Sequence, residues 1–465
     1  MKVLVTGATG FIGGRLVRQL LEAGYEVRAL VRAPDRASEL ARAGVELAPG
    51  DVTEPASLER ALDGVEGVFH LAAVYDFGLE AEHMRRVNVE GTRHVLDAAA
   101  RAGVPRVLYC GSDTSLGDTK GELRDENKVH DGDDRSAYET TKREAHRLVC
   151  ERARDGAPVI NAIVSTVYGP GDPSVIGELI ENHLAGRLIF TLDRAAGYTF
   201  AHVDDVATAL RLAFEKGRVG ESYLVSGTPA SFGDFFRALS KVSGIAPPAV
   251  EPPGWLVTSL TPVLALLGRA AGKSPRAVRE LLAMGRNVTR FFSSEKARRE
   301  LGWTPRSLEK GLADTVPSFA AREREAAARA LGRTRLWLAG LALLDLWLGT
   351  RAAFFPQAYV DDVHARFFAL HPSGPTYWVV RLGFVWLFFC AVEALAALAP
   401  RRRVLLVLIV GALRLMEVPA DVAYGIAADD LGRFGRIGLV VSPIFNGLVG
   451  AYLCLTARRA IRSDP

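Results

Sequence analysis

A glycine-rich turn near the amino terminus constrains the fold more than any other feature. The apolar residues KVLV (2–5) lead into TGATGFIG (6–13), a helical pattern follows as far as Gly24, and a second apolar run covers 26–31. A short strand, a turn, a helix and another strand in this order form a βαβ unit. Gly7, Gly10 and Gly13 lack side chains, so the backbone can turn tightly and approach a pyrophosphate at the amino end of the helix. The spacing in this context predicts a dinucleotide-binding domain.

The end of the second predicted strand bears on which dinucleotide is bound. An NAD-specific unit places an acid there to bind the adenosine ribose, whereas this chain reads Leu30-Val31-Arg32. Arg32, helped by Arg36, can pair with the 2′-phosphate of NADP, which a carboxylate would repel. We therefore predict NADP, with NAD as the alternative in which Arg32 is a solvated surface residue. Asp51-Val52 is placed to meet the adenine amino group, although Asp51 can equally cap a turn.

A second group of residues predicts the chemistry. Tyr138 and Lys142 lie four apart on a predicted helix and therefore share one face. A free phenol has a pKa of ~10, and a neighbouring ammonium lowers it by favouring phenolate. Ser112 follows the fifth predicted strand and can orient a substrate oxygen beside Tyr138, with Thr114 as the second candidate for that role. Together with a nicotinamide, these groups form a redox site for a carbonyl or a secondary alcohol.

Residues 1 to about 320 resemble the extended short-chain dehydrogenase/reductase superfamily, including 3β-hydroxysteroid dehydrogenases, dihydroflavonol reductases and NAD-dependent epimerases/dehydratases. The resemblance rests on eight motifs in order: TGATGFIG (6–13), DV (51–52), HLAA (70–73), NVEGT (88–92), GSDTSLG (111–117), YETTK (138–142), VYGPGD (167–172) and HVDD (202–205). It implies an α/β fold, a Rossmann-type doubly wound parallel sheet with a small substrate subdomain. It also implies four catalytic residues: Ser112, Tyr138, Lys142 and Asn88. The cofactor contacts that it implies are Gly7, Thr9, Gly10, Phe11, Ile12, Gly13, Arg32, Asp51, Val52, Leu71, Ala72, Ala73, Tyr138, Lys142, Ser165 and Val167.

Other features of residues 1–325 have structural interpretations. His202 with Asp204-Asp205 is expected to cap a helix and tie substructures together rather than to catalyse. The apolar segment 255–273 is interrupted by Pro262 and has the length of a substrate lid or an interfacial helix. The four cysteines lack CxxC spacing, so we predict no metal site. A net charge of +4 without a basic stripe gives little support to nucleic acid binding.

The last third of the chain is dominated by apolar runs. Four segments, about 336–355, 377–399, 404–426 and 437–456, approach the ~20 residues that cross a bilayer. Arginines concentrate before the first, after the second and after the fourth segment, which by the positive-inside rule places both termini and the catalytic domain in the cytoplasm. We therefore predict an integral, multi-pass membrane protein. Its parts are residues 1–325, a basic linker at 326–335, an all-α transmembrane four-helix bundle at 336–457, and a cytosolic tail at 458–465.

Charged residues inside these apolar segments need partners. Arg414, Glu417 and Asp421 recur at helical intervals, and Asp345 lies at a similar depth in the first segment. Ionisable groups in a membrane are costly unless paired. We therefore expect an Asp345–Arg414 pair and an Asp421–Arg381 pair, with a transport path or a second redox site as the alternative interpretation.

Three functions remain for comparison. The leading one is a membrane-anchored NAD(P)-dependent oxidoreductase for an apolar substrate such as a sterol, a hopanoid or a long-chain lipid. The alternatives are a nucleotide-sugar or lipid-linked sugar epimerase/dehydratase, and a non-catalytic cofactor-binding scaffold or redox sensor. The expected partners are the small-molecule substrate and the lipid bilayer, without nucleic acid, and assembly as a homodimer is left open.

Overall fold

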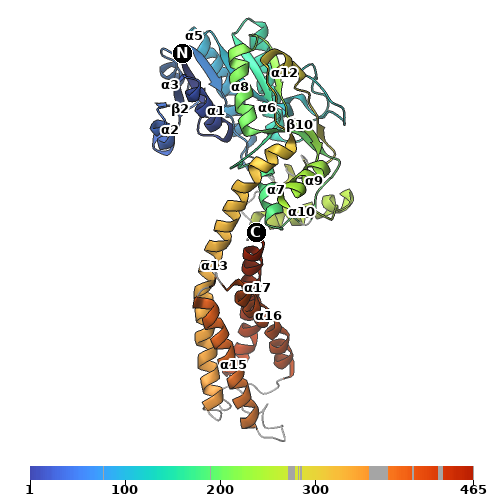
Figure 1. Cartoon of the computed structure of the whole chain (residues 1–465). Coiled ribbons are helices and arrows are strands. Elements are labelled where there is room, and N and C mark those ends of the chain that lie inside the picture. Colours follow the sequence, from blue (N-terminus) through green and yellow to red (C-terminus); the bar gives the residue numbers. More distant parts are fainter. Residues whose placement is uncertain are drawn as a thin grey trace. The chain divides into compact units, whose positions relative to one another are not determined.

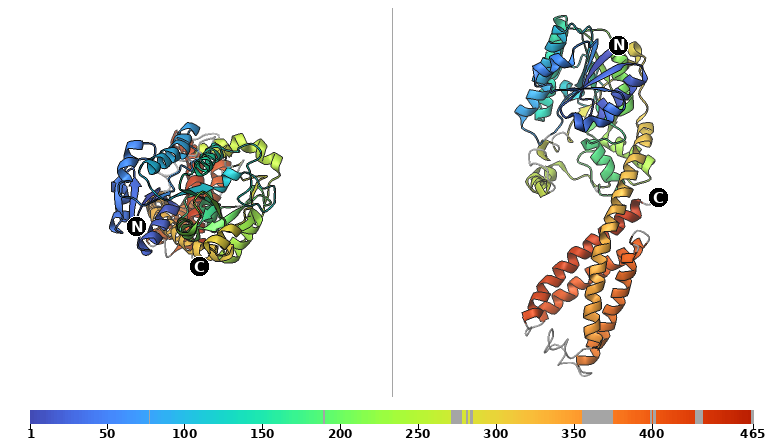
Figure 2. Two further views of the ribbon diagram at one scale, coloured as in Figure 1. Left: turned by 90° about the horizontal axis from the view of Figure 1, so that it is seen from above. Right: turned by 90° about the vertical axis from the view of Figure 1, so that its left-hand side faces the viewer.

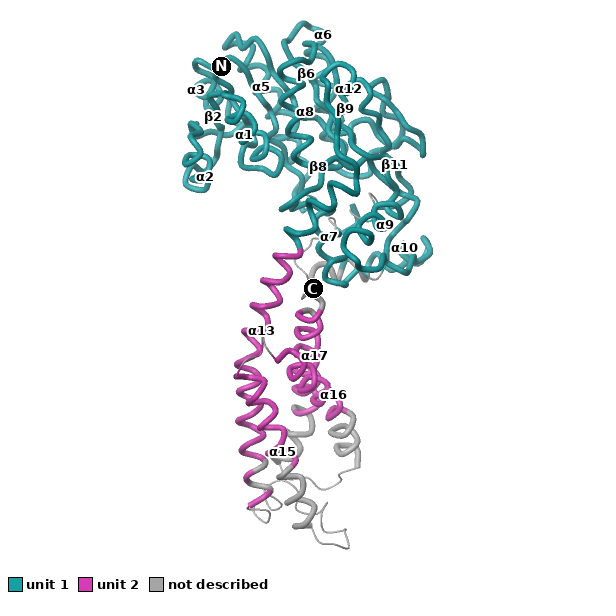
Figure 3. The backbone as a smooth tube through the Cα atoms, viewed as in Figure 1, with its two compact units in different colours: residues 1–319 teal, residues 320–465 magenta. Residues whose placement is uncertain are grey.

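The computed structural model describes residues 1–76, 78–188, 190–270, 278–280, 282, 285–354, 375–398, 400, 403–427 and 433–463. The chain forms two compact units, Met1–Phe319 and Ala320–Pro465 (Figure 3). Helix α13 (Leu308–Phe354) runs through the boundary without a break. The predicted basic linker at 326–335 is therefore helical.

A seven-stranded parallel sheet forms the centre of the first unit, with helices on both faces (Figures 1 and 2). Its strand order is β3-β2-β1-β4-β5-β6-β9. Val3 and Val5 of β1 face a core built with α1 and α8, whereas Leu4 faces the opposite core, because successive side chains of a strand alternate between faces. The strands are β1 (Lys2–Thr6), β2 (Glu26–Val31), β3 (Glu46–Pro49), β4 (Gly67–His70), β5 (Val107–Ser112), β6 (Val159–Val164) and β9 (Ser222–Val225). This arrangement confirms the predicted Rossmann-type fold.

The helices and short turns of this unit flank the large sheet. They are α1 (Phe11–Glu22), a 3₁₀ turn (Pro34–Ala37), α2 (Ser38–Arg42), α3 (Pro55–Ala61), α4 (Ala81–Arg85), a π-helical turn (Arg86–Glu90), α5 (Gly91–Arg101), a 3₁₀ turn (Asp113–Leu116), α6 (Ala137–Arg154), α8 (Val203–Lys216) and α12 (Glu295–Leu301).

A second, smaller sheet forms the predicted substrate subdomain. Its order is β10 (Thr228–Ser231), β8 (Gly197–His202) and β11 (Thr289–Arg290), and β7 (Thr166–Tyr168) also pairs with β8. Aromatic side chains such as Tyr168, Phe200 and Phe235 fill the core between this sheet and helices α7 (Val175–Leu184) and α9 (Phe232–Ser243). Helix α10 (Gly254–Ala270) contains Pro262 and exposes Trp255, while its role as a lid or an interfacial helix stays a prediction.

The second unit contains long helices where the sequence places them. After α13 come α15 (Pro375–Leu398), α16 (Val404–Ala427) and α17 (Arg433–Ser463). Helices α16 and α17 pack closely through Gly411 and Gly450, since a Cβ at Gly411 would lie 2.8 Å from the backbone nitrogen of Cys454. Within the part of the chain that the structure describes, none of the helices combines the length and the apolar composition needed to cross a bilayer. The helix positions are therefore confirmed, whereas the prediction of four membrane-spanning helices is not supported.

Charged side chains meet inside this helical unit. Arg414 donates to Asp345 at 2.7 Å and to Glu417 at 3.1 Å, and it also pairs with Glu393. Asp345, Glu393 and Arg414 are all buried. The predicted Asp345–Arg414 pair is thus confirmed, with Glu393 as a further partner. The predicted Asp421–Arg381 pair lies outside the described side chains.

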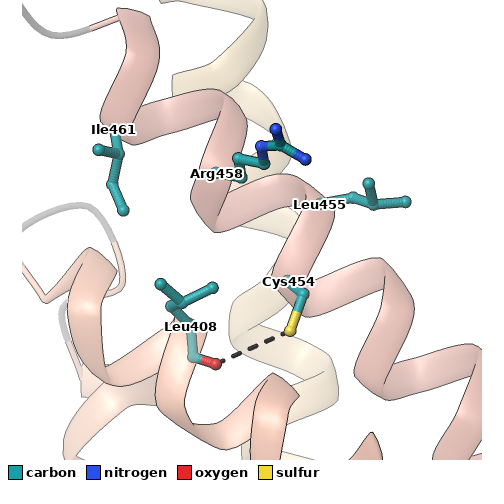
Figure 4. Close-up of a pocket in the computed structure, with 5 residues that line it drawn as sticks. All are labelled: Leu408, Cys454, Leu455, Arg458 and Ile461. Carbon is teal, nitrogen blue, oxygen red and sulfur yellow. Dashed lines mark hydrogen bonds between the residues drawn. The ribbon is translucent and has the colours of Figure 1, made fainter.

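The carboxyl end of α17 also borders a small apolar hollow of ≈ 330 Å³ (Figure 4). Its walls come from α16 and α17, and Cys454 Sγ donates to the carbonyl oxygen of Leu408 at 3.8 Å. The other lining residues are Leu455, Arg458 and Ile461.

Candidate active site

The glycine turn between β1 and α1 has room for nothing larger than glycine at two positions. Gly7 adopts a positive φ of 72°, and a Cβ there would lie 2.8 Å from the backbone nitrogen of Ala72. A Cβ at Gly13 would lie 2.1 Å from the carbonyl oxygen of Gly7. Gly10 precedes α1 as a cap without a side-chain acceptor, so the first N–H groups of the helix stay available to an anion. The turn therefore fits the pyrophosphate of a dinucleotide.

A groove of ≈ 630 Å³ opens beside this turn. Its lining includes Thr9, Gly10 and Phe11, further residues of α1 and α2, and part of the segment 170–173. Ile12, predicted as a cofactor contact, directs its side chain into the core instead. Three of the six contacts predicted in this segment, Thr9, Gly10 and Phe11, thus line a groove in which a cofactor could bind.

The residues predicted at the adenosine end are only partly placed as expected. Arg32 lies exposed immediately after β2, as an NADP-binding arginine would. Asp51 Oδ1 accepts from the backbone nitrogen and from Oγ1 of Thr53, both at 2.8 Å. Asp51 therefore caps a turn, and its contact with adenine stays a prediction. Val52 is buried in the core.

A buried chain of hydrogen bonds supports the strand ends next to the glycine turn. Thr6 Oγ1 accepts from the backbone nitrogens of Leu71 and Ala72 at 3.2 and 3.1 Å and lies 2.8 Å from His70 Nδ1. His70 Nε2 lies 3.0 Å from Thr92 Oγ1. Burial, with a smaller effect of Lys142, lowers the pKa of His70 to about 3, so the ring is neutral. The chain fixes the backbone of 71–73, which was predicted to contact the cofactor.

Ser112, Tyr138 and Lys142 come together at the carboxyl end of the sheet. Ser112 ends β5, and Tyr138 and Lys142 lie one turn apart at the start of α6. Ser112 hydrogen-bonds to Tyr138, and Lys142 Nζ donates to the carbonyl oxygen of Cys110 at 3.4 Å. Burial raises the pKa of Tyr138 to about 12, while Lys142 acts in the opposite direction. The expected lowering by Lys142 is therefore present but smaller than the effect of burial.

Asn88 and Thr114 support this group. Asn88 Nδ2 donates to the carbonyl oxygen of Val74 and to Thr141 Oγ1, both at 3.1 Å. Asn88 Oδ1 accepts from the Val74 nitrogen at 2.7 Å, which ties the loop after β4 to α6. Thr114 Oγ1 donates to Ser112 Oγ at 2.9 Å. Thr114 is thus a partner of Ser112, and which of the two hydroxyls orients the substrate stays a prediction.

Two further groups of predictions concern the cofactor contacts Ser165 and Val167 and the helix-capping HVDD motif. Ser165 is buried just after β6, with its Oγ 2.6 Å from Ser226 Oγ, and Val167 lies in β7. His202 caps α8 by accepting from the Asp204 nitrogen at 3.3 Å. Asp205 pairs with Arg306 at 2.8 Å. The structural interpretation of the HVDD motif is confirmed.

Sequence reasoning missed a polar cluster around the catalytic group. Tyr75 meets the ring of Tyr138 edge-on, with centroids 4.9 Å apart. Asp113 follows Ser112, and burial raises the pKa of Asp113 to about 7, against the lowering effects of Arg290 and Ser165. Arg290 is buried and pairs with Glu139. No local pattern links residue 290 to residues 113 and 139, because the strand pairing that joins them forms only in the folded chain.

Comparisons with known proteins agree with this geometry. Residues 3–226 match the model of the NAD dependent epimerase/dehydratase family. Sterol demethylase protein B of Methylococcus capsulatus is 33% identical over 70% of this chain and 99% of its own length. The 3-beta-hydroxysteroid dehydrogenase of Mycolicibacterium neoaurum is 28% identical over 68% of this chain and 91% of its own length. Among solved structures, gox2253 is 37% identical, covers 69% of this chain and 98% of its own, and has a TM-score of 0.60.

Proposed function

Because the chain belongs to the NAD dependent epimerase/dehydratase family and is an NAD(P)-dependent oxidoreductase, we propose that it interconverts a ketone and a secondary alcohol on a sterol, a hopanoid or a long-chain lipid. The observation that carries the proposal is the meeting of Ser112, Tyr138 and Lys142 beside a glycine turn that fits a dinucleotide. The names of two relatives, a sterol demethylase protein and a 3-beta-hydroxysteroid dehydrogenase, support the substrate class.

Ser112, Tyr138 and Lys142 have different roles in the proton transfer. When bound, the nicotinamide supplies or accepts the hydride. In the reductive direction, the hydroxyls of Ser112 and Tyr138 donate hydrogen bonds to the ketone oxygen, and Tyr138 then transfers its proton to the nascent alkoxide. The ammonium of Lys142 stabilises the phenolate that remains. Oxidation reverses these steps, with the Tyr138 phenolate as the base.

NADP is the proposed cofactor. Arg32 is exposed after β2, and no acid follows that strand at the position where a carboxylate would bind an NAD ribose. In the full chain, kcat/KM for NADPH should exceed that for NADH, and Arg32→Asp should reverse the preference. The exposed Arg60→Asp, on α3 and outside the groove, is the matched control for the loss of one surface arginine. Equal use of both cofactors by the parent chain would contradict the NADP assignment.

The helical unit is the proposed site of membrane association, with the catalytic unit facing the cytoplasm. The ion pairs of Arg414 lie inside this unit, whereas large apolar side chains are exposed on its helices, an arrangement that suits lipid as the surrounding medium. The exposed apolar residues include Leu336, Trp337, Leu343, Trp347, Phe388, Leu405, Met416, Leu448 and Leu455. The protein should float with liposomes of phosphatidylcholine and phosphatidylglycerol, and extraction at alkaline pH distinguishes embedding from surface binding. Failure to float without detergent would overturn the association.

Turnover by the full chain tests the catalytic proposal. The protein is offered NADPH with sterol and long-chain ketones, NADP with the matching alcohols, and nucleotide sugars in parallel. We expect cofactor turnover with the lipid substrates and its loss in Tyr138→Phe. Turnover of nucleotide sugars alone would favour an epimerase or dehydratase, and a Tyr138→Phe variant with full cellular function would favour a cofactor-binding scaffold.

A further inference from the structure

Three charged side chains adjoin the catalytic group without a role in the mechanism above. Asp113 is the residue after Ser112, Glu139 is the residue after Tyr138, and Arg290 reaches them from β11 of the small sheet. Their exposed fractions are 2%, 2% and 1%. Charges are rarely buried so completely unless a partner or a ligand compensates them. The cluster also links the end of β5 in the large sheet to β11 in the small sheet.

The position of Arg290 is fixed on two sides. Its guanidinium pairs with Glu139, and its central carbon lies 5.4 Å from the centroid of the Tyr198 ring. Glu139 in turn accepts from the backbone nitrogen of Arg135. The guanidinium is therefore held before any substrate arrives, which lowers the entropic cost of using it for recognition.

Three polar atoms of the cluster remain unsatisfied. Nε and Nη1 of Arg290 and Oδ2 of Asp113 are buried without a hydrogen-bond partner among the described residues. No ion pair within 4.0 Å joins Arg290 to Asp113, although each affects the pKa of the other. A buried donor or acceptor without a partner costs about 1–3 kcal/mol, so this arrangement favours a group that satisfies both sides.

The unsatisfied atoms define the chemistry of that group. It must accept a hydrogen bond from the Arg290 guanidinium and donate one to Asp113 Oδ2. A hydroxyl does both, whereas an ether or a ketone only accepts, and a carboxylate would also face the Asp113 carboxylate. Asp113 is the residue after Ser112, so the group would lie one residue along the chain from the place where Ser112 and Tyr138 hold the substrate oxygen. Tyr75, whose ring meets that of Tyr138, is 44% exposed.

We propose that Arg290 and Asp113 form a recognition subsite for a hydroxyl on the carbon next to the one that is oxidised or reduced. The preferred substrates are then α-hydroxy ketones and the vicinal diols that correspond to them. This inference rests on the proposed ketone/alcohol activity and specifies its substrate class. A substrate without the hydroxyl leaves Asp113 Oδ2 and the facing N–H of Arg290 unsatisfied in the complex, and sites built to bind a hydroxyl reject analogues that lack it.

Three matched ring ketones test the subsite in the full chain with NADPH. They are cyclododecanone, 2-hydroxycyclododecanone and 2-methoxycyclododecanone, and the measured quantity is the ratio of their kcat/KM values. We expect the hydroxy ketone to exceed the unsubstituted ketone by ~100-fold, and the methoxy ketone, which accepts but cannot donate, to be the poorest of the three. Equal use of the hydroxy and unsubstituted ketones, or of the hydroxy and methoxy ketones, would overturn the proposal.

Variants separate recognition by the protein from the chemical reactivity of the ketones, because that reactivity does not change from one variant to the next. Asp113→Asn and Arg290→Met should each reduce the hydroxy-to-unsubstituted ratio at least ~10-fold. Arg194→Met, which removes a half-exposed arginine from the same subdomain, should leave the ratio unchanged. Asp113→Asn keeps the size of the side chain, and NADPH affinity reports whether each variant is folded. An unchanged ratio in a folded Asp113→Asn protein would overturn the subsite, whereas a parent chain that binds NADPH but reduces none of the ketones would overturn the proposed function with it.

Discussion

The two units differ in the surface that surrounds their buried polar groups. In Met1–Phe319, the chain Thr6–His70–Thr92 is buried as neutral hydrogen-bonding groups between apolar cores. In Ala320–Pro465, a full ion pair between Arg414 and Asp345 is buried, and large apolar side chains are exposed around it. A neutral network costs little to bury when it is satisfied, whereas buried charges need close partners. The first unit also buries the Arg290–Glu139 ion pair, so the difference between the units lies in the large apolar side chains that are exposed around the charges of the second.

The largest expected effect tests the chemical side of this comparison. Tyr138→Phe removes the proton that reaches the substrate oxygen and keeps the ring that packs edge-on against Tyr75. We expect kcat to fall by ~10³-fold, within the range for removal of a general acid, with NADPH affinity almost unchanged. Tyr168→Phe is the control, because the Tyr168 hydroxyl bonds to the Leu308 carbonyl in the subdomain core at 3.3 Å. A similar loss in both variants would point to packing rather than proton transfer.

The next effect concerns the charges in the helical unit. Arg414→Met leaves the buried carboxylates of Asp345 and Glu393 without their cation, and breaking a buried pair in this way costs about 3–5 kcal/mol. The free energy of local unfolding can be followed by thiol labelling of Cys454, resolved by mass spectrometry. Arg324→Met, at an exposed position of α13, should change it little.

A double-mutant cycle separates the pair from its surroundings. Asp345→Asn combined with Arg414→Met should cost less than the sum of the two single changes, because the second substitution then removes a charge that has already lost its partner. Additive losses would mean that the two side chains contribute independently, despite their 2.7 Å contact.

The parts that could be predicted depend on local patterns. The glycine spacing predicted the turn, and the four-residue spacing of Tyr138 and Lys142 predicted a shared helix face; both are present in the structure. The apolar segments located the helices of the second unit, and the cost of unpaired charge predicted the Asp345–Arg414 pair. Each of these patterns can be recognised in the sequence without knowing which distant residues pack together in the fold.

The parts that could not be predicted depend on long-range contacts. Arg290 reaches Glu139 only because β11 joins the small sheet, and Glu393 joins Arg414 only when α15 packs beside α16. Burial also reversed the expected net shift in the pKa of Tyr138, because the buried surroundings outweigh Lys142. Hydropathy placed the helices correctly but did not establish that they cross a membrane.

Matched glycine substitutions probe close packing in each unit. A Cβ at Gly13 would lie 2.1 Å from the Gly7 carbonyl oxygen, whereas at neighbouring Gly14 the nearest atom is 3.7 Å away. In the helical unit, a Cβ at Gly411 would lie 2.7 Å from Cys454 Sγ, whereas Gly340 has nothing within 4 Å. Gly13→Ala and Gly411→Ala should each cost about 3 kcal/mol of stability, and the two controls should be neutral or slightly stabilising. NADPH affinity should fall only in Gly13→Ala, and a fall in Gly411→Ala would contradict separate roles for the two glycines.

The smallest expected effect follows from the neutral network of the first unit. The pKa of folded His70 is about 3, and that of an unfolded histidine is ~6.5, so only the unfolded chain takes up this proton as the pH falls between these values. The contribution of His70 to stability is therefore complete above pH ~6.5 and decreases by about 2 kcal/mol by pH 5. His70→Gln should remove that part of the acid sensitivity in denaturant unfolding of the catalytic unit. His83→Gln, near the surface, is the control, and an unchanged pH dependence in His70→Gln would show that another buried group takes up the proton.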